Sequence, residues 1–197
     1  MDQEGDEGNE MKTKTIIHLL SGGLDSVTML YDLRQQGHSV HCVLFDYKQQ
    51  HVQELTFAKG HCHRLGVLFT TIDLPPLGGL SDESWIVPNR NAILLSLAVN
   101  LAVKAGADTV TIGCNQDDEA GFPDCRMAFI QTFNTMLMTA EIRVEVCAPY
   151  LDWPKWKIAR HASDLGVPTN EIWTCYRGGA KPCGDCPACQ KLKAALA

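Results

Sequence analysis

The stretch IIHLLSGGLDSVTMLYDL, from Ile16 to Leu33, joins a strand-like run to a helical run through a six-residue turn. A parallel sheet places such a turn at the carboxyl end of a strand, where the next helix presents unpaired backbone N–H groups and the positive end of its dipole. Glycine lets the backbone wrap closely around an anion, while hydroxyl and carboxylate groups add donors and a ligand for magnesium. The turn therefore predicts a phosphate-binding loop.

The predicted phosphate-binding residues are those of the turn itself: Ser21, Gly22, Gly23, Leu24, Asp25 and Ser26. Asp25 is the expected magnesium ligand and a catalytic residue. The turn lacks the Gly-Lys-Ser/Thr ending of a Walker A loop and is not G-x-G-x-x-G, which disfavours ordinary kinases and dehydrogenases. The competing interpretation is a ligand-free helix start, in which a Ser or Asp side chain caps the helix.

Outward from this turn, short β-branched runs alternate with helical stretches, a pattern typical of βαβ units on a parallel sheet. Strands are expected at 15–20, 39–47, 67–74, 108–114 and 143–150, and helices at 26–36, 49–65, 90–105, 125–139 and 154–165. The predicted fold is α/β, a doubly wound, mainly parallel five-stranded sheet. It occupies residues 14–166, between an acidic tail at 1–13 that we expect to be disordered and a Cys-, Gly- and Pro-rich segment at 167–197.

Composition and charge limit the classes of protein that fit. The chain of 197 residues is 45% hydrophobic and 20% charged, which suits one domain with a packed core. Its net charge is −6, but five acidic residues and no basic ones fall in the first ten positions, so the rest is nearly neutral and argues against binding of nucleic acid. No apolar run reaches the roughly 18 residues that cross a membrane, and we expect a cytoplasmic protein.

Four of the nine cysteines crowd the C-terminus with the spacing C-x7-C-x2-C-x2-C: Cys175, Cys183, Cys186 and Cys189. Turn-forming Gly and Pro between them let the four thiolates converge on one centre, which suits a structural zinc site with no open position. An iron–sulfur cluster is the alternative, because it takes the same ligands.

The motifs together resemble the 7-cyano-7-deazaguanine synthase (QueC) family of PP-loop ATP pyrophosphatases. The resemblance rests on SGGLDS (21–26) and TCYRGGAKPCGDCPAC (174–189), and extends through FDYKQQHVQE (45–54), VPNRNAILLSLA (87–98), GCNQDDEAGFPDCR (113–126) and PYLDWPKWKI (149–158). It implies an adenine nucleotide alpha hydrolase-like fold, ATP, Mg²⁺ and Zn²⁺, and a homodimer. The implied reaction adenylates 7-carboxy-7-deazaguanine, forms the amide with ammonia, and dehydrates the amide to the nitrile after a second adenylation.

The motif positions imply roles for single residues. Lys155 and Arg90 are expected as catalytic cations near phosphate, and Asp46 and Tyr47 beside adenosine. Acidic groups suit the deazaguanine edge, because its ring N–H and amino groups are donors. The predicted acceptor pocket consists of Asn91, Asn115, Asp117, Asp118, Phe122, Asp124 and Arg126.

Departures from the family pattern fall near the acceptor pocket and leave the ATP loop untouched. Lys48-Gln49-Gln50-His51 replaces the family's Gly-Gln-Arg-His, Asp118-Glu119-Ala120 replaces an Asp-Tyr-Ser, the 73–88 connection is short, and no arginine follows Cys189 closely. Adenylation is therefore predicted, with the nucleophile left open. One alternative is a QueC-like enzyme that stops at the amide or transfers the activated carboxyl to a protein amine in an accessory or antiviral system. Others are a PP-loop tRNA sulfurtransferase with sulfur on Cys114 or Cys125, and a non-catalytic nucleotide-binding scaffold.

Overall fold

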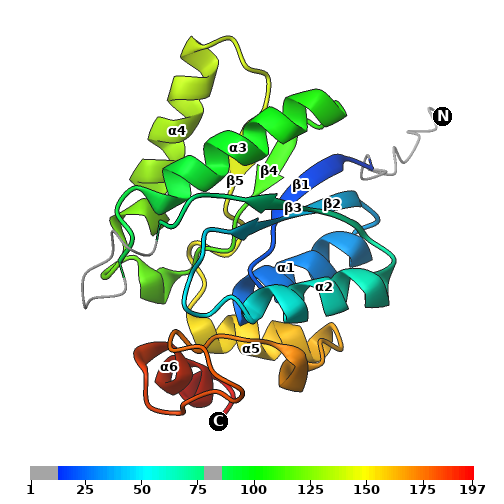
Figure 1. The fold of residues 1–197 in the computed structure, drawn as a ribbon. Helices are drawn as coiled ribbons and strands as arrows, with labels where there is room; N and C mark the ends of the chain where they lie inside the picture. Colours follow the sequence, from blue (N-terminus) through cyan, green and yellow to red (C-terminus); the bar gives the residue numbers. More distant parts are fainter. Residues whose placement is uncertain (1–12, 78–85) are drawn as a thin grey trace, which may run out of the picture.

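The computed structural model describes residues 13–77 and 86–197, and these form a sheet of five parallel strands (Figure 1). The strands are β1 (Thr15–Leu19), β2 (Ser39–Asp46), β3 (Leu68–Asp73), β4 (Thr109–Thr111) and β5 (Glu145–Cys147), in the order β3-β2-β1-β4-β5. Every neighbouring pair is parallel. Because strand order reverses between β1 and β4, a ligand-binding crevice is expected at their carboxyl ends. The predicted doubly wound sheet is confirmed.

Helices cover both faces of the sheet (Figure 1). One face carries α1 (Leu24–Gln35), α2 (Glu54–Leu65) and α5 (Lys155–Asp164), and the other carries α3 (Arg90–Ala105) and α4 (Met127–Thr139). A further helix, α6 (Pro187–Ala195), contacts α5 on the side away from the sheet. Short 3-10 turns occupy Gln116–Asp118, Pro123–Cys125 and Thr169–Glu171. None of the helices in the described ranges has the length and apolar character needed to cross a membrane.

Alternate residues of β1 pack on opposite faces, so the central strand is apolar on both sides. Ile16 belongs to the core under α1, whereas Ile17 belongs to the core under α3. The next residue of the strand, His18, is fully buried. One ring nitrogen lies 2.8 Å from the Thr111 hydroxyl and the other lies 2.8 Å from the Ser26 carbonyl. Burial lowers the His18 pKa to about 4. A neutral histidine thus fastens β1 to β4 and to the helix that begins in the phosphate-binding turn.

Four of the five predicted helix starts differ from the structure, those of α4 and α5 by only two residues and one residue. Helix α1 begins at Leu24, inside the turn, and α2 begins at Glu54, five residues after the predicted start at Gln49. The Gln49 side chain donates to the Phe45 carbonyl (3.1 Å) and accepts from the Tyr47 backbone N–H (2.9 Å). Such side-chain bonds to the backbone compete with a helix and hold this segment in turns.

The C-terminal segment contains more regular structure than predicted. Helix α6 begins at Pro187, which suits the first helical position because that N–H has no helical partner. The Trp173 backbone N–H donates to the Gly22 carbonyl at 2.8 Å, so the segment is tied to the phosphate-binding turn. The predicted disordered tail at 1–13 lies almost wholly outside the described residues, as does much of the 73–88 connection.

Candidate active site and metal centre

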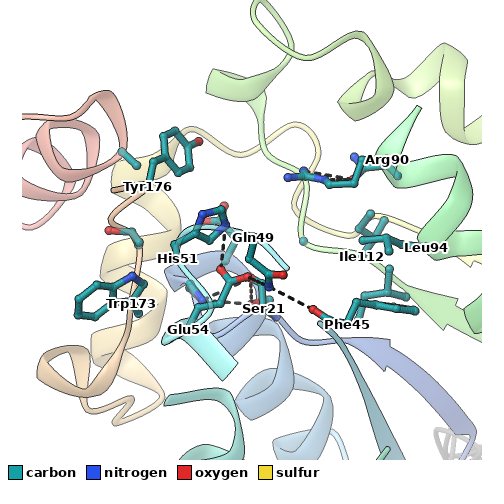
Figure 2. A pocket seen from close by; sticks show the side chains of 18 of the residues that line it. Ser21, Phe45, Gln49, His51, Glu54, Arg90, Leu94, Ile112, Trp173 and Tyr176 are labelled. Atoms are coloured by element: carbon teal, nitrogen blue, oxygen red, sulfur yellow. Dashed lines mark hydrogen bonds and ion pairs between the residues drawn. The ribbon is translucent and has the colours of Figure 1, made fainter. Parts of the chain in front are cut away.

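A cavity of about 740 Å³ opens at the carboxyl ends of β1, β2 and β4 (Figure 2). This volume lies within the range of about 300–1,000 Å³ that is typical of ligand sites. Four parts of the chain meet there: the SGGLDS turn, the segment from β2 into α2, the start of α3 with the loop after β4, and the C-terminal segment. The cavity therefore coincides with the topological switch point of the sheet.

The SGGLDS turn approaches its neighbours too closely for a side chain at Gly22. This residue has φ +86°, and a Cβ there would lie 2.4 Å from the Glu54 carbonyl oxygen. Gly23 is the N-cap of α1, and no side chain among the described residues caps this helix. The side-chain cap that the competing interpretation expects is therefore absent from the described part of the chain, and phosphate binding by the turn stays a prediction. The first turn of α1 keeps its N–H groups available for an anion.

Asp25 is the centre of a buried polar network. Its Oδ2 accepts from Lys155 Nζ (2.6 Å) and from Asn115 Nδ2 (2.8 Å), and Asn115 Nδ2 also donates to Asp118 Oδ2 (2.6 Å). Asp25 Oδ1 is buried and has no hydrogen-bond partner among the described residues. Buried polar atoms are rarely unpaired, and a carboxylate oxygen is a preferred ligand of Mg²⁺. The unpaired oxygen fits a bound cation.

The two predicted catalytic cations lie on different walls. Lys155 is the first residue of α5, and Asp117 fixes that helix start by accepting from the Lys155 backbone N–H at 2.9 Å. Arg90 is the first residue of α3; its Nε and Nη2 donate to Asn91 Oδ1 at 3.3 Å. Figure 2 shows the Arg90 guanidinium pointing into the cavity, opposite His51. Positive charge thus reaches the cavity from both sides of the switch point.

The wall formed by the β2–α2 segment carries a carboxyl group that the sequence analysis did not assign. Glu54 Oε1 accepts from Gln49 Nε2 at 2.9 Å, and Glu54 Oε2 lies 3.6 Å from His51 Nε2 (Figure 2). Burial raises the Glu54 pKa to about 8, although Gln49 and Arg90 oppose the shift. Burial and Arg90 together lower the His51 pKa to about 4. Both groups therefore favour their neutral forms at pH 7. Both residues belong to the stretch FDYKQQHVQE, which had been singled out in the sequence without a role for either of them.

A stability prediction follows from Glu54. Because its folded pKa lies above the ordinary value of 4.5, its stabilising contribution is complete below pH 4.5 and is lost as pH rises towards 8. The free energy of unfolding of Glu54→Gln, relative to that of the wild type, should be about 3 kcal/mol higher at pH 8.5 than at pH 5.5, at about 1.4 kcal/mol per pKa unit. Urea unfolding at both pH values measures this. The exposed Glu119→Gln control should show no such gain, and a pH-independent effect of Glu54→Gln would contradict the assignment.

Eleven of the predicted site residues line the cavity: Ser21, Gly23, Leu24, Asp25, Ser26, Tyr47, Arg90, Asn91, Asp118, Phe122 and Lys155. Six others are not among the described residues that line it: Gly22, Asp46, Asn115, Asp117, Asp124 and Arg126. The predicted site is therefore assembled in one place, but part of it lies behind the cavity wall.

The residues outside the wall have identifiable partners. Asp46 pairs with Lys48 at 3.3 Å, and Asp124 Oδ2 accepts from the Asn91 backbone N–H at 3.4 Å. Arg126 is exposed, and its Nε donates to the Glu119 carbonyl at 2.9 Å. These contacts turn the side chains towards the surface or the backbone, and the predicted contacts of Asp46, Asp124 and Arg126 with a ligand stay predictions.

The C-terminal segment supplies part of the wall that the sequence analysis missed: Trp173, Thr174, Tyr176, Ala188 and Lys191. The Trp173 ring packs against Phe57 of α2 with the ring centroids 5.4 Å apart. These residues lie about 150 positions from the SGGLDS turn in the chain, and no local pattern linked them to it.

The four C-terminal cysteines converge as predicted. The sulfur atoms of Cys175, Cys183, Cys186 and Cys189 all lie within 4.8 Å of one another, and this is the one such group of possible metal ligands in the described part of the chain. Cys186 is the N-cap of α6 and Cys189 lies in its first turn. Four thiolates at this spacing can surround a single metal ion.

The fold and site define a class of protein, the PP-loop type of α/β fold with an SGG turn at the switch point. A solved NMN synthetase from Francisella tularensis shares this fold, with a TM-score of 0.61 and 14% identity over 95% of this chain and 85% of its own. The U34-tRNA thiolase NcsA from Methanococcus maripaludis, with its [4Fe-4S] cluster, has a TM-score of 0.58 and 16% identity over 95% of this chain and 66% of its own. At these identities the likeness is one of fold.

Sequence relatives narrow the class to one family. The model of queuosine biosynthesis protein QueC matches residues 15–86 and 81–197. A 7-cyano-7-deazaguanine synthase from Pseudoalteromonas translucida (strain TAC 125) is 39% identical over 200 residues, which cover 91% of this chain and 92% of the relative. The chain therefore belongs to the QueC family.

Proposed function

We propose that this chain is an ATP-dependent ligase that converts 7-carboxy-7-deazaguanine into 7-cyano-7-deazaguanine. Family membership and the curated relatives named 7-cyano-7-deazaguanine synthase support the substrate and product. The observation that carries the mechanism is the meeting of the SGGLDS turn, the Asp25–Lys155 pair and acceptor-side residues in one cavity. Nucleotide and acceptor can then react without leaving the site.

In the first step, the substrate carboxylate oxygen forms a bond to the α-phosphorus of ATP as the bond to pyrophosphate breaks. The free N–H groups at the start of α1 receive the departing phosphates, and Lys155 supplies positive charge beside Asp25. Asp25 Oδ1 would hold the accompanying Mg²⁺, which neutralises phosphate charge. Ammonia then attacks the activated carbonyl carbon, loses a proton and displaces AMP. In a second adenylation, the amide oxygen bonds to the α-phosphorus of another ATP as pyrophosphate leaves and the amide nitrogen loses a proton. Loss of AMP from the carbon and of the remaining proton from the nitrogen then gives the nitrile.

The acceptor would lie between the Asp118 side of the cavity and the wall with Glu54. Both side chains end in carboxyl groups, which can accept from the N–H groups of a deazaguanine edge. Phe122 also lines the cavity and offers a ring for stacking on the base. Of the residues predicted for the acceptor pocket, this placement retains Asp118 and Phe122, and it adds Glu54.

Zinc is the ion we propose for the four cysteines. Zinc–thiolate bonds of about 2.3 Å in a tetrahedron place the sulfurs about 3.8 Å apart. Cys183 Sγ and Cys189 Sγ lie 3.9 Å apart, which fits one ion better than a larger iron–sulfur cluster. Zinc supplies structural cross-linking when bound, because four thiolates leave no open position. A homodimer and a cytoplasmic location stay predictions.

Sulfur transfer is a weaker alternative. Cys114 and Cys125 both line the cavity, but the Cys125 side chain and burial hold the Cys114 pKa well above its usual value. A thiol of raised pKa is a poor nucleophile at neutral pH. Termination at the amide, or transfer to a protein amine, uses the same activation step and differs only in the nucleophile.

Mass spectrometry of the products tests the proposal. The purified protein is incubated with ATP, Mg²⁺, 7-carboxy-7-deazaguanine and ammonium. We expect AMP together with the nitrile. If the amide is the only product, the reaction stops there, and a supplied protein amine then tests whether it is the natural nucleophile. If no AMP forms with this acid, adenylation is contradicted.

A further inference from the structure

The C-terminal helix contributes a cation to the cavity that no motif assigned. Lys191 of α6 lines the cavity, and its Nζ donates to Asp118 Oδ1 at 3.3 Å and to the Asp117 carbonyl at 3.2 Å. Its side chain is 43% exposed. The ammonium group therefore lies at the wetter, acceptor side of the cavity.

Lys191 ends a chain of polar contacts that begins at the phosphate-binding turn. Lys155 binds Asp25, Asn115 joins Asp25 to Asp118, and Asp118 binds Lys191. The two lysines thus sit at opposite ends of one network that contains two carboxylates. An incoming anion would be repelled by these carboxylates unless a cation met it at the open end.

The cations that line the cavity differ in how firmly they are engaged. Lys155 has a 16% exposed side chain and a 2.6 Å contact with Asp25, whereas Lys191 has a longer and more exposed ion pair. Arg90 reaches in from the α3 wall. Lys48 also lines the cavity, but it pairs with Asp46 and Asp73, which are not among the described residues that line it. Of the two lysines in the Asp25–Asp118 network, Lys191 can exchange partners at the smaller cost, because Asp118 keeps its hydrogen bond from Asn115.

We propose that Lys191 binds the carboxylate of the acid substrate and that the four-cysteine centre holds Lys191 in place. This inference rests on the function proposed above. The carboxylate of a bound acid would replace Asp118 as the partner of the Lys191 ammonium group. The charge of the substrate carboxylate would then be neutralised beside the α-phosphate of ATP.

The cysteine centre controls the position of Lys191 through α6. This helix has nine residues, which is too short for independent stability in water. Cys186 precedes its first turn, Cys189 lies within that turn, and Lys191 follows two residues later. Metal binding to the two cysteines therefore fixes the backbone that carries the lysine.

The test compares Lys191→Ala, Lys191→Arg and Lys193→Ala. Lys193 is a matched control, because it is an exposed lysine of the same helix and is not among the described residues that line the cavity. A charge-assisted contact is worth about 1.5–3 kcal/mol, so Lys191→Ala should raise KM for the acid roughly 10- to 100-fold. The KM for ATP and the metal content of the protein should each stay within about twofold of the wild type. The Lys191→Arg variant should recover most of the affinity for the acid. Calorimetry of acid binding without ATP should show the same loss.

The preformed amide, 7-carboxamido-7-deazaguanine, distinguishes binding from a structural effect. It carries no carboxylate, so Lys191→Ala should leave its KM nearly unchanged. Equal losses for acid and amide, or a loss with Lys193→Ala of the same size, would overturn the role of Lys191. If the wild type converts the acid and Lys191→Ala converts it equally well, this inference is refuted and the proposed function stands. A wild-type protein that neither binds nor converts the acid would refute both.

Discussion

Asp25→Asn should slow AMP release from ATP and the acid substrate, with a fall in kcat of about 10²- to 10³-fold or more. The substitution removes the charge that Lys155 Nζ and Asn115 Nδ2 contact, at 2.6 and 2.8 Å, and turns an acceptor into a donor at one of these positions. It also removes the unpaired Oδ1 charge that would hold magnesium. Breaking such a buried pair costs about 3–5 kcal/mol, which corresponds to this loss of rate if it falls on the transition state. Quantifying AMP by chromatography checks the result.

Two further variants separate catalysis from folding. Asp164→Asn changes an exposed carboxylate at the far end of α5 and should retain full AMP release. The double variant Asp25→Asn/Lys155→Met removes the unpaired buried ammonium, so it should regain thermal stability without regaining activity. Wild-type AMP release from Asp25→Asn, with an intact circular dichroism spectrum, would contradict the role of this carboxylate.

Cys186→Ser should release the bound metal and lower Tm sharply, and it should increase hydrogen exchange from Trp173 to the C-terminus. The separate buried cluster of this segment consists of Trp173, Cys175, Cys186 and Cys189, so three of its four buried side chains are proposed metal ligands. Loss of the metal should therefore loosen this cluster, although Leu192 and Ala195 still pack against the main core. The apparent binding free energy of a structural zinc ion is about 10–16 kcal/mol in small peptides, which is comparable to the stability of a whole domain. Metal analysis, thermal unfolding and hydrogen exchange provide the measurements.

The matched control is Cys147→Ser, which changes a partly buried cysteine of β5 outside the four-cysteine group. It should keep the metal and leave exchange in α6 unchanged. Because the C-terminal segment lines the cavity, loss of the metal should also weaken binding of the acid more than binding of ATP. A Cys186→Ser protein with full metal content and wild-type Tm would contradict the predicted centre.

The sequence by itself was enough for those features that neighbouring residues decide. Alternating β-branched and helical runs predicted the five parallel strands, because buried strands and amphipathic helices have different periods. SGGLDS predicted the turn at the end of β1, since its glycines and short polar side chains act within a few residues. The spacing of the four cysteines predicted their convergence for the same reason.

Tertiary structure decided which polar side chains face the cavity. Asp117 and Arg126 sit in the predicted loop, yet one fixes the start of α5 and the other bonds Glu119 at the surface. Glu54 and Lys191 were not assigned, yet both line the cavity. A side chain's direction depends on partners brought together by packing of distant elements, as when Trp173 contacts Gly22 and carries the C-terminal segment to the phosphate-binding turn. Local sequence patterns carry no record of such distant contacts, which exist only once the sheet, its helices and the C-terminal segment have packed together.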